Sequence, residues 1–464
     1  MRGAADNLSI GSGAAAPGAR IAVIGSGVSG LSAAWLLGQR HEVHLFEADH
    51  RIGGHSNTVV VDGQPVDTGF IVFNEATYPN LIALFDHLGV ASRRTDMGFA
   101  VTLDEGRLEY AGGDIGGLFA QKRNLVSPRF WSMLGDLVRF YRAAPGALRQ
   151  AGDLSLDGLL REMGIGAAFR DDHLYPMAAA IWSTPVARIG DYPAAAFVRF
   201  CENHGLLSLG ARPAWRTVEG GSRCYVEKLA ATLAGRIATA TPVRAVRRHA
   251  DGVDLRTDRG EARFDHVVIA AHADQALAML DDADEQERAT LGAFGYRANA
   301  ACLHGDAAAM PRRRRAWSAW NYASRGGSAD PQLSVTYWMN RLQGWLPRER
   351  ELFVTLNPLD PIDARRLHAW IDYAHPVFDA PALRAQGALW GLQGRRRTWF
   401  CGAHFGAGFH EDGLQAGLAV AEQLGGVRRP WRVIDESGRI TITPRDRSSP
   451  DCSALPLPKE MPCT

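Results

Sequence analysis

The pattern of apolar residues near the N-terminus predicts a strand, a turn, a helix and a second strand in quick succession. Residues 21–24 (IAVI) form a short apolar run that is typical of a buried strand. Residues 31–37 (LSAAWLL) predict a helix, and residues 42–47 (EVHLFE) predict a second strand. A strand, a helix and a strand in this order begin a right-handed unit of a mostly parallel sheet.

Glycines occupy the turn between the first strand and the helix. Gly25, Gly27 and Gly30 have the spacing GxGxxG. The first glycine makes the tight turn, the second lets the backbone approach a pyrophosphate, and the third lets the helix pack on the strand. Glu47 ends the second strand about 20 residues further on, where a carboxylate can accept both ribose hydroxyls. The unit therefore predicts dinucleotide binding, which also involves the turn residues Ser26, Val28 and Ser29.

The remaining apolar pattern predicts a second kind of structure. Residues 241–271 predict a β-meander with the strands PVRAV, VDLRT and ARFDHVVIAA, divided by the turns HADG and DRGE. Residues 99–205 and 276–388 alternate helical stretches with the aromatic-rich strands SAWNY, LSVTYWMN and ELFVTLNP. These two segments do not continue the nucleotide-binding pattern, so we expect them to form a separate cap domain.

Composition narrows the classes of function. A chain of 464 residues exceeds one ordinary core, so two domains are expected. The net charge of +1 gives no reason to propose nucleic acid as a partner. Six cysteines without a CxxC pair argue against a disulfide framework or a metal cluster and favour a reducing compartment. With no signal peptide or spanning segment, we expect a cytoplasmic protein with flexible tails at 1–17 and 445–464.

Further motifs carry a family resemblance. ADHRIGGH follows Glu47, VDTGFIVFNEATYPNLIALFDHLGV covers 66–90 with a helix expected at 77–88, and WRTVEGGSRCYVEKLA covers 215–230. FCGAHFGAGFHEDGLQAG covers 400–417 and precedes a helical run. Together these stretches resemble the flavin-containing amine oxidase and phytoene desaturase superfamily. The resemblance implies an α/β fold, with a Rossmann-like FAD-binding domain of the glutathione-reductase type and a discontinuous α+β cap.

The resemblance also implies domain bounds and FAD contacts. The FAD-binding domain is expected to combine 18–98, 206–275 and 389–428, and the cap to combine 99–205 and 276–388. One non-covalent FAD is implied, although His55 or His404 stays open as a covalent attachment point. Backbone N–H groups of 402–414 are expected to face the pyrimidine edge of the flavin and to stabilise charge on its reduced form. The implied contact residues beyond the first turn and Glu47 are Ala48, Arg51, Gly53, Gly54, His55, Gly69, Phe70, Val243, Ala270, Gly402, Asp412, Gly413 and Leu414.

The chain departs from the amine oxidase pattern at two places. Amine oxidases often hold a lysine near flavin N5, but none of Lys122, Lys228 and Lys459 lies in 276–388. Phe409 stands where a tyrosine usually completes the amine cage. The motifs R-x-G-G-H, D-T-G-F-I-V-F-N and G-F-H-E-D-G are similar to a branch associated with methylated and furan fatty acids. That similarity implies oxidation of an unsaturated or methylated acyl chain; a flavin amine oxidase and a non-catalytic flavin-binding subunit are the alternatives.

The candidate catalytic residues follow from the same alignment. Abstraction of a hydride from an acyl chain requires a nearby base, and His410 and Glu411 are the titratable groups expected nearest the flavin. Histidine suits a proton acceptor near neutral pH, whereas a helix-start residue that bonds backbone or FAD is the competing interpretation of His410. Tyr78 and His204 are further candidates, placed near the flavin by family topology.

Two features bear on partners without deciding between alternatives. The helix predicted at 128–150 combines an apolar face with arginines, which is typical of a helix on a membrane surface and also of an ordinary cap helix. Peripheral contact with the inner face of a membrane therefore stays open beside a small-molecule or lipid substrate. Six aromatic residues either line an apolar tunnel or pack a core, the commoner use: Trp317, Trp320, Tyr322, Tyr337, Trp338 and Trp345.

Overall fold

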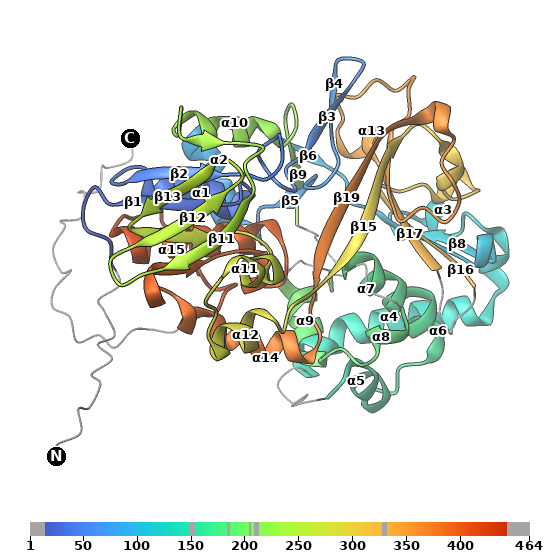
Figure 1. Cartoon of the computed structure of the whole chain (residues 1–464). Coiled ribbons are helices and arrows are strands. Elements are labelled where there is room, and N and C mark those ends of the chain that lie inside the picture. The colour runs from blue at the N-terminus through green and yellow to red at the C-terminus, as the bar shows by residue number, and fades with distance from the viewer. Residues whose placement is uncertain are drawn as a thin grey trace, which may run out of the picture.

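The computed structural model describes residues 14–147, 154–182, 186–203, 206–207, 213–326 and 332–442. Figure 1 shows a parallel sheet with its covering helices on one side and a larger, mostly antiparallel sheet on the other. The long strands β15 (Gly295–His304) and β19 (Leu367–Val377) run side by side between the two halves.

The parallel sheet has five strands in the order β10-β2-β1-β14-β20. The strands are β1 (Arg20–Ile24), β2 (Glu42–Phe46), β10 (Ile237–Ala238), β14 (His266–Ile269) and β20 (Thr398–Phe400), and every neighbouring pair is parallel. Ile21, Val23, Val43 and Val268 are fully buried, as expected for strands covered on both faces. The sheet therefore draws its strands from three separated parts of an α/β fold, and the α/β class predicted from the sequence is confirmed.

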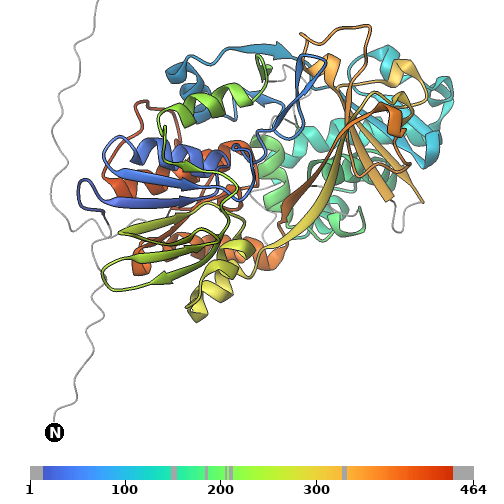
Figure 2. The same ribbon diagram turned by 45° about the horizontal axis from the view of Figure 1, so that its top comes forward.

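The predicted β-meander is correct in its first two strands and wrong in its third. β11 (Val243–Arg248), β12 (Val253–Thr257) and β13 (Gly260–Phe264) form an antiparallel three-stranded sheet, which lies beside the parallel sheet in both views (Figures 1 and 2). The single strand predicted at 262–271 is divided at Asp265. The Asp265 carboxylate accepts a hydrogen bond from the Arg20 N–H at 2.7 Å, and the Asp265 N–H donates to the Arg20 carbonyl at 2.8 Å. These bonds turn the chain into the parallel sheet as β14.

Two helices pack closely against each other beside the parallel sheet, α1 (Val28–Leu37) and α15 (His410–Gly425). A Cβ on Gly413 would lie 2.8 Å from Ser29 Oγ, and a Cβ on Gly417 would lie 2.2 Å from the Ser29 carbonyl oxygen. These two glycines of the 400–417 stretch are therefore required by helix packing, which the cofactor-based interpretation of the stretch did not include.

Shorter elements complete this half of the molecule. α2 (Pro79–Leu88) begins two residues later than predicted, because Pro79 fits the first helical position. The other helices are α10 (Arg223–Ala231), α11 (Ala273–Met279), α12 (Glu285–Leu291) and α14 (Ala380–Leu389). β3 (Thr58–Val61) pairs with β4 (Gln64–Asp67), and β9 (Trp215–Val218) lies between β5 (Phe73–Asn74) and β6 (Ser92–Thr95).

The other half is built on a seven-stranded sheet in the order β19-β15-β18-β17-β16-β7-β8. Its remaining strands are β7 (Phe99–Leu103), β8 (Leu108–Ala111), β16 (Trp320–Arg325), β17 (Gln332–Trp338) and β18 (Phe353–Leu356). The three predicted aromatic-rich strands are thus β16, β17 and β18. Trp317, Trp320 and Tyr322 are buried, so these aromatic side chains pack a core.

Helices cover one face of this sheet (Figure 1). They are α4 (Pro128–Ala147), α5 (Leu156–Glu162), α6 (Ala167–Phe169), α7 (Tyr175–Trp182), α8 (Val186–Ile189) and α9 (Ala194–Asn203); α3 (Ile115–Leu118) and α13 (Met339–Leu342) are single turns. Phe130, Phe140 and Tyr141 of α4 are buried in an apolar core shared with the seven-stranded sheet, whereas Trp131 is exposed. Within the described ranges, no helix is long and apolar enough to cross a membrane.

Candidate functional site

The glycine turn after β1 has the geometry that the sequence predicted. Gly25 has a φ of +99°, and a Cβ there would lie 2.6 Å from the Ala270 carbonyl oxygen. A Cβ on Gly30 would lie 1.9 Å from the Gly25 carbonyl oxygen, so α1 packs against the turn. By contrast, no atom lies within 4 Å of a Cβ built on Gly27. The second glycine therefore faces open space at the N-terminus of α1, where a phosphate is favoured.

Glu47 lies beside this turn, directly after β2. Its carboxylate accepts hydrogen bonds from the Ser26 N–H at 2.8 Å, the Ser26 hydroxyl at 2.5 Å and the Asp49 N–H at 2.9 Å. These contacts hold the carboxylate at the carboxyl edge of the parallel sheet, the edge at which dinucleotides bind. Ala48, the next residue, is exposed at the same edge.

A second glycine loop lies against the first. The Gly53 N–H donates to the Ser26 carbonyl at 3.0 Å, and a Cβ on Gly54 would lie 3.0 Å from the Gly27 Cα. Arg51 Nη1 donates to the Gly54 carbonyl at 2.8 Å and so fixes the loop. Gly27 and the glycines of the second loop thus meet at the N-terminus of α1. Without side chains at these positions, the backbone can approach a pyrophosphate closely.

A hydrogen-bonded cluster joins the remaining motifs. His410 Nε2 lies 2.7 Å from the Tyr225 hydroxyl and 3.4 Å from the Ser56 hydroxyl, and these two hydroxyls are also bonded to each other. The His410 ring stacks on Phe70 with 3.8 Å between ring centroids. Ser56 follows the R-x-G-G loop, Phe70 belongs to the D-x-G segment, and Tyr225 lies on α10. Four motifs that are distant in sequence therefore meet at His410.

Burial decides the charge state of this cluster. Burial lowers the pKa of His410 to about 3, so its imidazole is neutral near pH 7. Burial also raises the pKa of the Tyr225 hydroxyl well above its ordinary value, and the neighbouring Ser56 hydroxyl offsets this only in part. The cluster is therefore an uncharged hydrogen-bonded chain.

The carboxylates next to His410 point to other partners. Glu411 is fully buried, and its oxygens accept from the Asn80 N–H, the Asn80 side-chain amide, the Leu81 N–H and Gln415 at 2.9 to 3.0 Å. It thereby satisfies the N-terminus of α2. Asp412 accepts from the Phe409 N–H at 2.8 Å and from Arg439 at 2.5 Å, so its side chain caps α15.

The other two catalytic candidates are Tyr78 and His204. Tyr78 is buried just before α2, with the Arg439 guanidinium 5.7 Å from its ring centroid. Burial raises the pKa of the Tyr78 hydroxyl well above its ordinary value, so the side chain is neutral. His204 lies outside the described residues.

A second group of histidines, of which the sequence analysis named His55 and His404 but not His375, lies between the two halves. His55 stacks on Tyr373 of β19 at 4.7 Å and lies 5.3 Å from His375, measured between ring centroids. The Nε2 atoms of His55 and His404 are buried and find no hydrogen-bond partner within the described part of the chain. Burial lowers the pKa of His375 to about 4 and that of His404 to about 3. These rings are therefore neutral, and two of them have a nitrogen available to a bound group.

The remaining predicted contacts lie around this region. A Cβ on Gly69 would lie 2.3 Å from the His55 carbonyl oxygen, and Ala270 continues the parallel sheet through its N–H bond to Ile24 at 2.8 Å. The other predicted contact residues, Val243 at the start of β11, Gly402 after β20 and Leu414 in α15, are buried. Tyr225 and His375 were missed, and only Tyr225 lies in a quoted motif.

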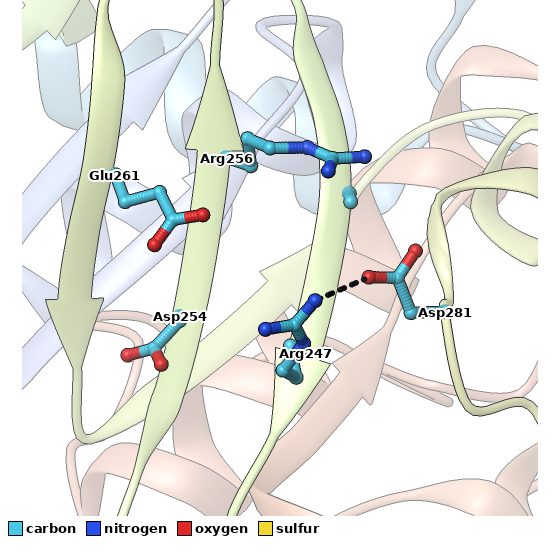
Figure 3. A pocket seen from close by; sticks show the side chains of 6 residues that line it. Arg247, Asp254, Arg256, Glu261 and Asp281 are labelled. Atoms are coloured by element: carbon cyan, nitrogen blue, oxygen red, sulfur yellow. Dashed lines mark ion pairs between the residues drawn. The ribbon is translucent and has the colours of Figure 1, made fainter.

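A charged hollow elsewhere is not a site. It lies on the three-stranded sheet, has a volume of about 10 Å³ and is lined by Arg247, Asp254, Arg256 and Glu261, with Asp281 beside it (Figure 3). Such a volume holds at most one water molecule. The ion pair in Figure 3, Arg247 with Asp281, spans 3.7 Å between exposed side chains and contributes little.

Taken together, the two glycine loops, Glu47 and the His55 nitrogen that has no partner among the described residues fit a dinucleotide bound at the carboxyl edge of a parallel sheet, which places the chain among the dinucleotide-binding α/β proteins. The family model described as flavin containing amine oxidoreductase matches residues 28–298, more than half of the chain. The chain therefore belongs to this family.

Individual similar proteins differ in the chemistry that their names give. The putative flavin-containing monoamine oxidase AofH of Mycobacterium tuberculosis is 29% identical over 260 residues, which are 54% of this chain and 56% of that protein. The chain thus spans about half the length of this curated relative. Putrescine oxidase bound to putrescine superposes with a TM-score of 0.64 at 15% identity, over 87% of this chain and 98% of the other. A fatty acid isomerase from P. acnes that produces CLA superposes with a TM-score of 0.59 at 16% identity, over 86% and 97%.

Proposed function

We propose that this enzyme oxidises an unsaturated or methylated fatty acyl chain with FAD as its cofactor. In this proposal the FAD-binding domain combines 18–98, 206–275 and 389–428, and residues 99–205 and 276–388 form the cap over the substrate. FAD would be held by Gly27, Glu47, Arg51 and the other contact residues named from the sequence, and when bound it would supply an acceptor for a hydride from the substrate.

The observation that carries the proposal is the apolar side of the turn before α15. Ala407 and Phe409 pack against the apolar core of the cap, which Phe99 and Tyr337 also contact. Burial raises the pKa of the Tyr337 hydroxyl to about 12, as expected for a hydroxyl in apolar surroundings. An acyl chain is stable in such surroundings, whereas a protonated amine would lose its hydration without a compensating carboxylate.

The departures from the amine oxidase pattern support the same substrate class. No lysine occurs in 276–388, and the only described lysine of the FAD half, Lys228, donates to the carbonyls of Leu88 and Gly89 at the end of α2. The chain shares its fold with both a putrescine oxidase and a fatty acid isomerase, so the structural likeness alone favours neither class of substrate.

The chain's own residues perform three tasks in this reaction. The apolar cap excludes water and holds the acyl chain in position, because an aliphatic C–H reacts only at close approach, within ~3.5 Å. His410 is the proposed proton acceptor, because its imidazole is neutral near pH 7, and since burial disfavours the charged imidazolium, the proton does not stay on the ring. Tyr225 and Ser56 are bonded to His410 and can pass that proton on. Glu411 is fully bonded to α2, so we assign it to positioning rather than to proton transfer.

Anaerobic reduction of the flavin tests the proposal. The FAD-loaded enzyme is mixed with an unsaturated fatty acid, with the corresponding phospholipid, or with putrescine and cyclohexylamine. We expect loss of the absorbance of oxidised flavin with an acyl compound and not with the amines. Reduction by an amine together with no reduction by any acyl compound would replace the proposal with the amine oxidase alternative.

A further inference from the structure

Exposed apolar side chains gather at one end of the cap. Of the large apolar residues exposed among the described residues, Ile115, Leu125, Val126 and Trp131 lie within one short stretch, with exposed fractions of 79%, 50%, 81% and 52%. We call these four residues the 115–131 patch. It includes α3 and the turn before α4, at the end of the molecule away from α1 and α15 (Figure 1).

Hydrogen bonds and ring contacts hold the patch together. The Trp131 indole N–H donates to the Leu125 carbonyl at 2.9 Å, and the Trp131 ring lies 5.7 Å from Phe119 between ring centroids. The Phe119 N–H in turn donates to the Ile115 carbonyl at 3.1 Å. These contacts link the segments that carry Ile115, Leu125 and Trp131.

In the loop at 121–126, the burial of polar and apolar side chains is the reverse of that in an ordinary surface loop. Its polar side chains Gln121 and Asn124 are buried, and both bond to Glu109 of β8, each at 3.1 Å. Its apolar side chains face outward instead. Because polar anchors fix the loop from inside, the exposure of Val126 and Leu125 is built into the fold.

Unpaired cations surround the patch. Lys122 and Arg123 belong to the same turn as Leu125 and Val126. Arg315 lies in the turn Arg314–Ala316, which packs on α3, and Arg312 precedes that turn. All four are exposed, and none forms an ion pair with a carboxylate of the described chain, although Arg313 and Arg314 pair with Glu109 and Glu351. One exposed carboxylate, Asp114, lies nearby and caps α3 through the Gly117 N–H at 2.6 Å.

From this arrangement we propose that the 115–131 patch docks the enzyme on an anionic lipid bilayer. Ile115 and Val126 protrude and would insert among acyl chains, Trp131 would lie at the headgroup level, and the four cations would contact lipid phosphates. Protruding side chains flanked by cations suit a deformable bilayer, whereas a protein partner would need a matching groove. The surface differs from the buried face of α4, and the proposal does not depend on which substrate is oxidised.

Vesicle flotation of the FAD-loaded enzyme tests the proposal. We expect the enzyme to float with vesicles of phosphatidylcholine and phosphatidylglycerol, to bind phosphatidylcholine alone more weakly, and to be released by salt. The double variant Ile115→Gln/Val126→Gln should bind roughly a hundredfold more weakly, about tenfold for each lost side chain. Lys122→Glu/Arg123→Glu should lose the preference for phosphatidylglycerol. Flavin absorbance of each variant verifies that the fold is retained.

The matched control is Ile434→Gln, because Ile434 is 88% exposed outside the patch. Its binding should equal that of the wild type. Failure of the wild type to bind anionic vesicles would overturn the proposal, as would undiminished binding of the Ile115→Gln/Val126→Gln variant. Self-association of the wild type that this variant abolishes, without any vesicle binding, would identify a second copy of the chain as the partner instead.

Discussion

At the residue scale, the Glu47 carboxylate is expected to contribute a large share of the affinity for FAD. A carboxylate that accepts ribose hydroxyls makes charge-assisted hydrogen bonds worth about 1.5–3 kcal/mol. Glu47→Gln should therefore weaken FAD binding by roughly 10- to 100-fold, measured by titrating the apoprotein with FAD. Glu42→Gln is the matched control, because Glu42 lies on the same strand with an exposed side chain and should bind FAD as the wild type does.

His410 carries the proposed proton transfer, and its low pKa gives that role a distinctive pH dependence. Flavin reduction by the acyl substrate should not fall as the pH is lowered from 8 to 5, because a group with a pKa of about 3 stays neutral throughout. His410→Gln should slow flavin reduction by roughly 100-fold while FAD binding is retained. His249, which is half-buried outside the proposed site and bonded to Asp254, provides a control in His249→Gln. A variant at position 410 with the wild-type rate across this range would show that His410 is not the proton acceptor.

At the element scale, the contact between α1 and α15 makes a glycine indispensable. A methyl group at Gly417 would meet the Ser29 carbonyl and Ser32 Oγ at 2.2 and 2.4 Å, so Gly417→Ala must move one helix. We expect a loss of about 3 kcal/mol in the free energy of unfolding, with weaker FAD retention, measured by chemical denaturation. Gly135→Ala in α4 is the opposite case, since no atom lies within 4 Å of the added methyl group. That variant should be neutral or more stable by up to about 1 kcal/mol, because alanine favours a helix.

The same scale explains which elements the sequence could predict. Gly25, Gly27 and Glu47 act within one local unit, so their spacing is enough to predict the turn and the strand that follows. The break at Asp265 was missed because it depends on Arg20, which is distant in the chain. Apolar runs alone do not distinguish one long strand from two strands in different sheets.

In the site too, features within one local segment could be predicted from the sequence, whereas features that join distant segments could not. The cofactor motifs are local in sequence, but the cluster at His410 requires Ser56 and Tyr225 to be brought from other segments. Glu411 appeared catalytic because it follows His410, and only the fold reveals that its carboxylate bonds to the N-terminus of α2. His375 lies on β19 in the half that carries no cofactor motif, and no pattern in the sequence links it to His55.

For the whole molecule, buried neutral histidines make stability depend steeply on pH. Burial lowers the pKa to about 4 in three of them and to about 3 in two: His266, His304, His375, His404 and His410. Their pKa in the unfolded chain is about 6.5, so between pH 6.5 and 4 the unfolded state binds more protons than the folded state. Stability is therefore present above pH ~6.5 and is lost as the pH falls. Asp67 acts in the opposite sense, because burial raises its pKa to about 6.

The balance between the five buried histidines and Asp67 predicts that the enzyme loses stability in acid. Near pH 5 the unfolded chain binds nearly five more protons at these histidines than the folded protein does, whereas at Asp67 the folded protein binds about one more. The free energy of unfolding should therefore fall by roughly 5 kcal/mol for each pH unit by which the pH is lowered. We expect the thermal midpoint to drop sharply below pH 6, measured by scanning calorimetry in buffers of equal ionic strength. His410→Gln removes one of the titrating groups and should reduce the slope by about 1.4 kcal/mol per pH unit. A thermal midpoint that stays constant between pH 6.5 and 4.5 would mean that these histidines are protonated in the folded protein, and the neutral cluster at His410 would have to be abandoned with them.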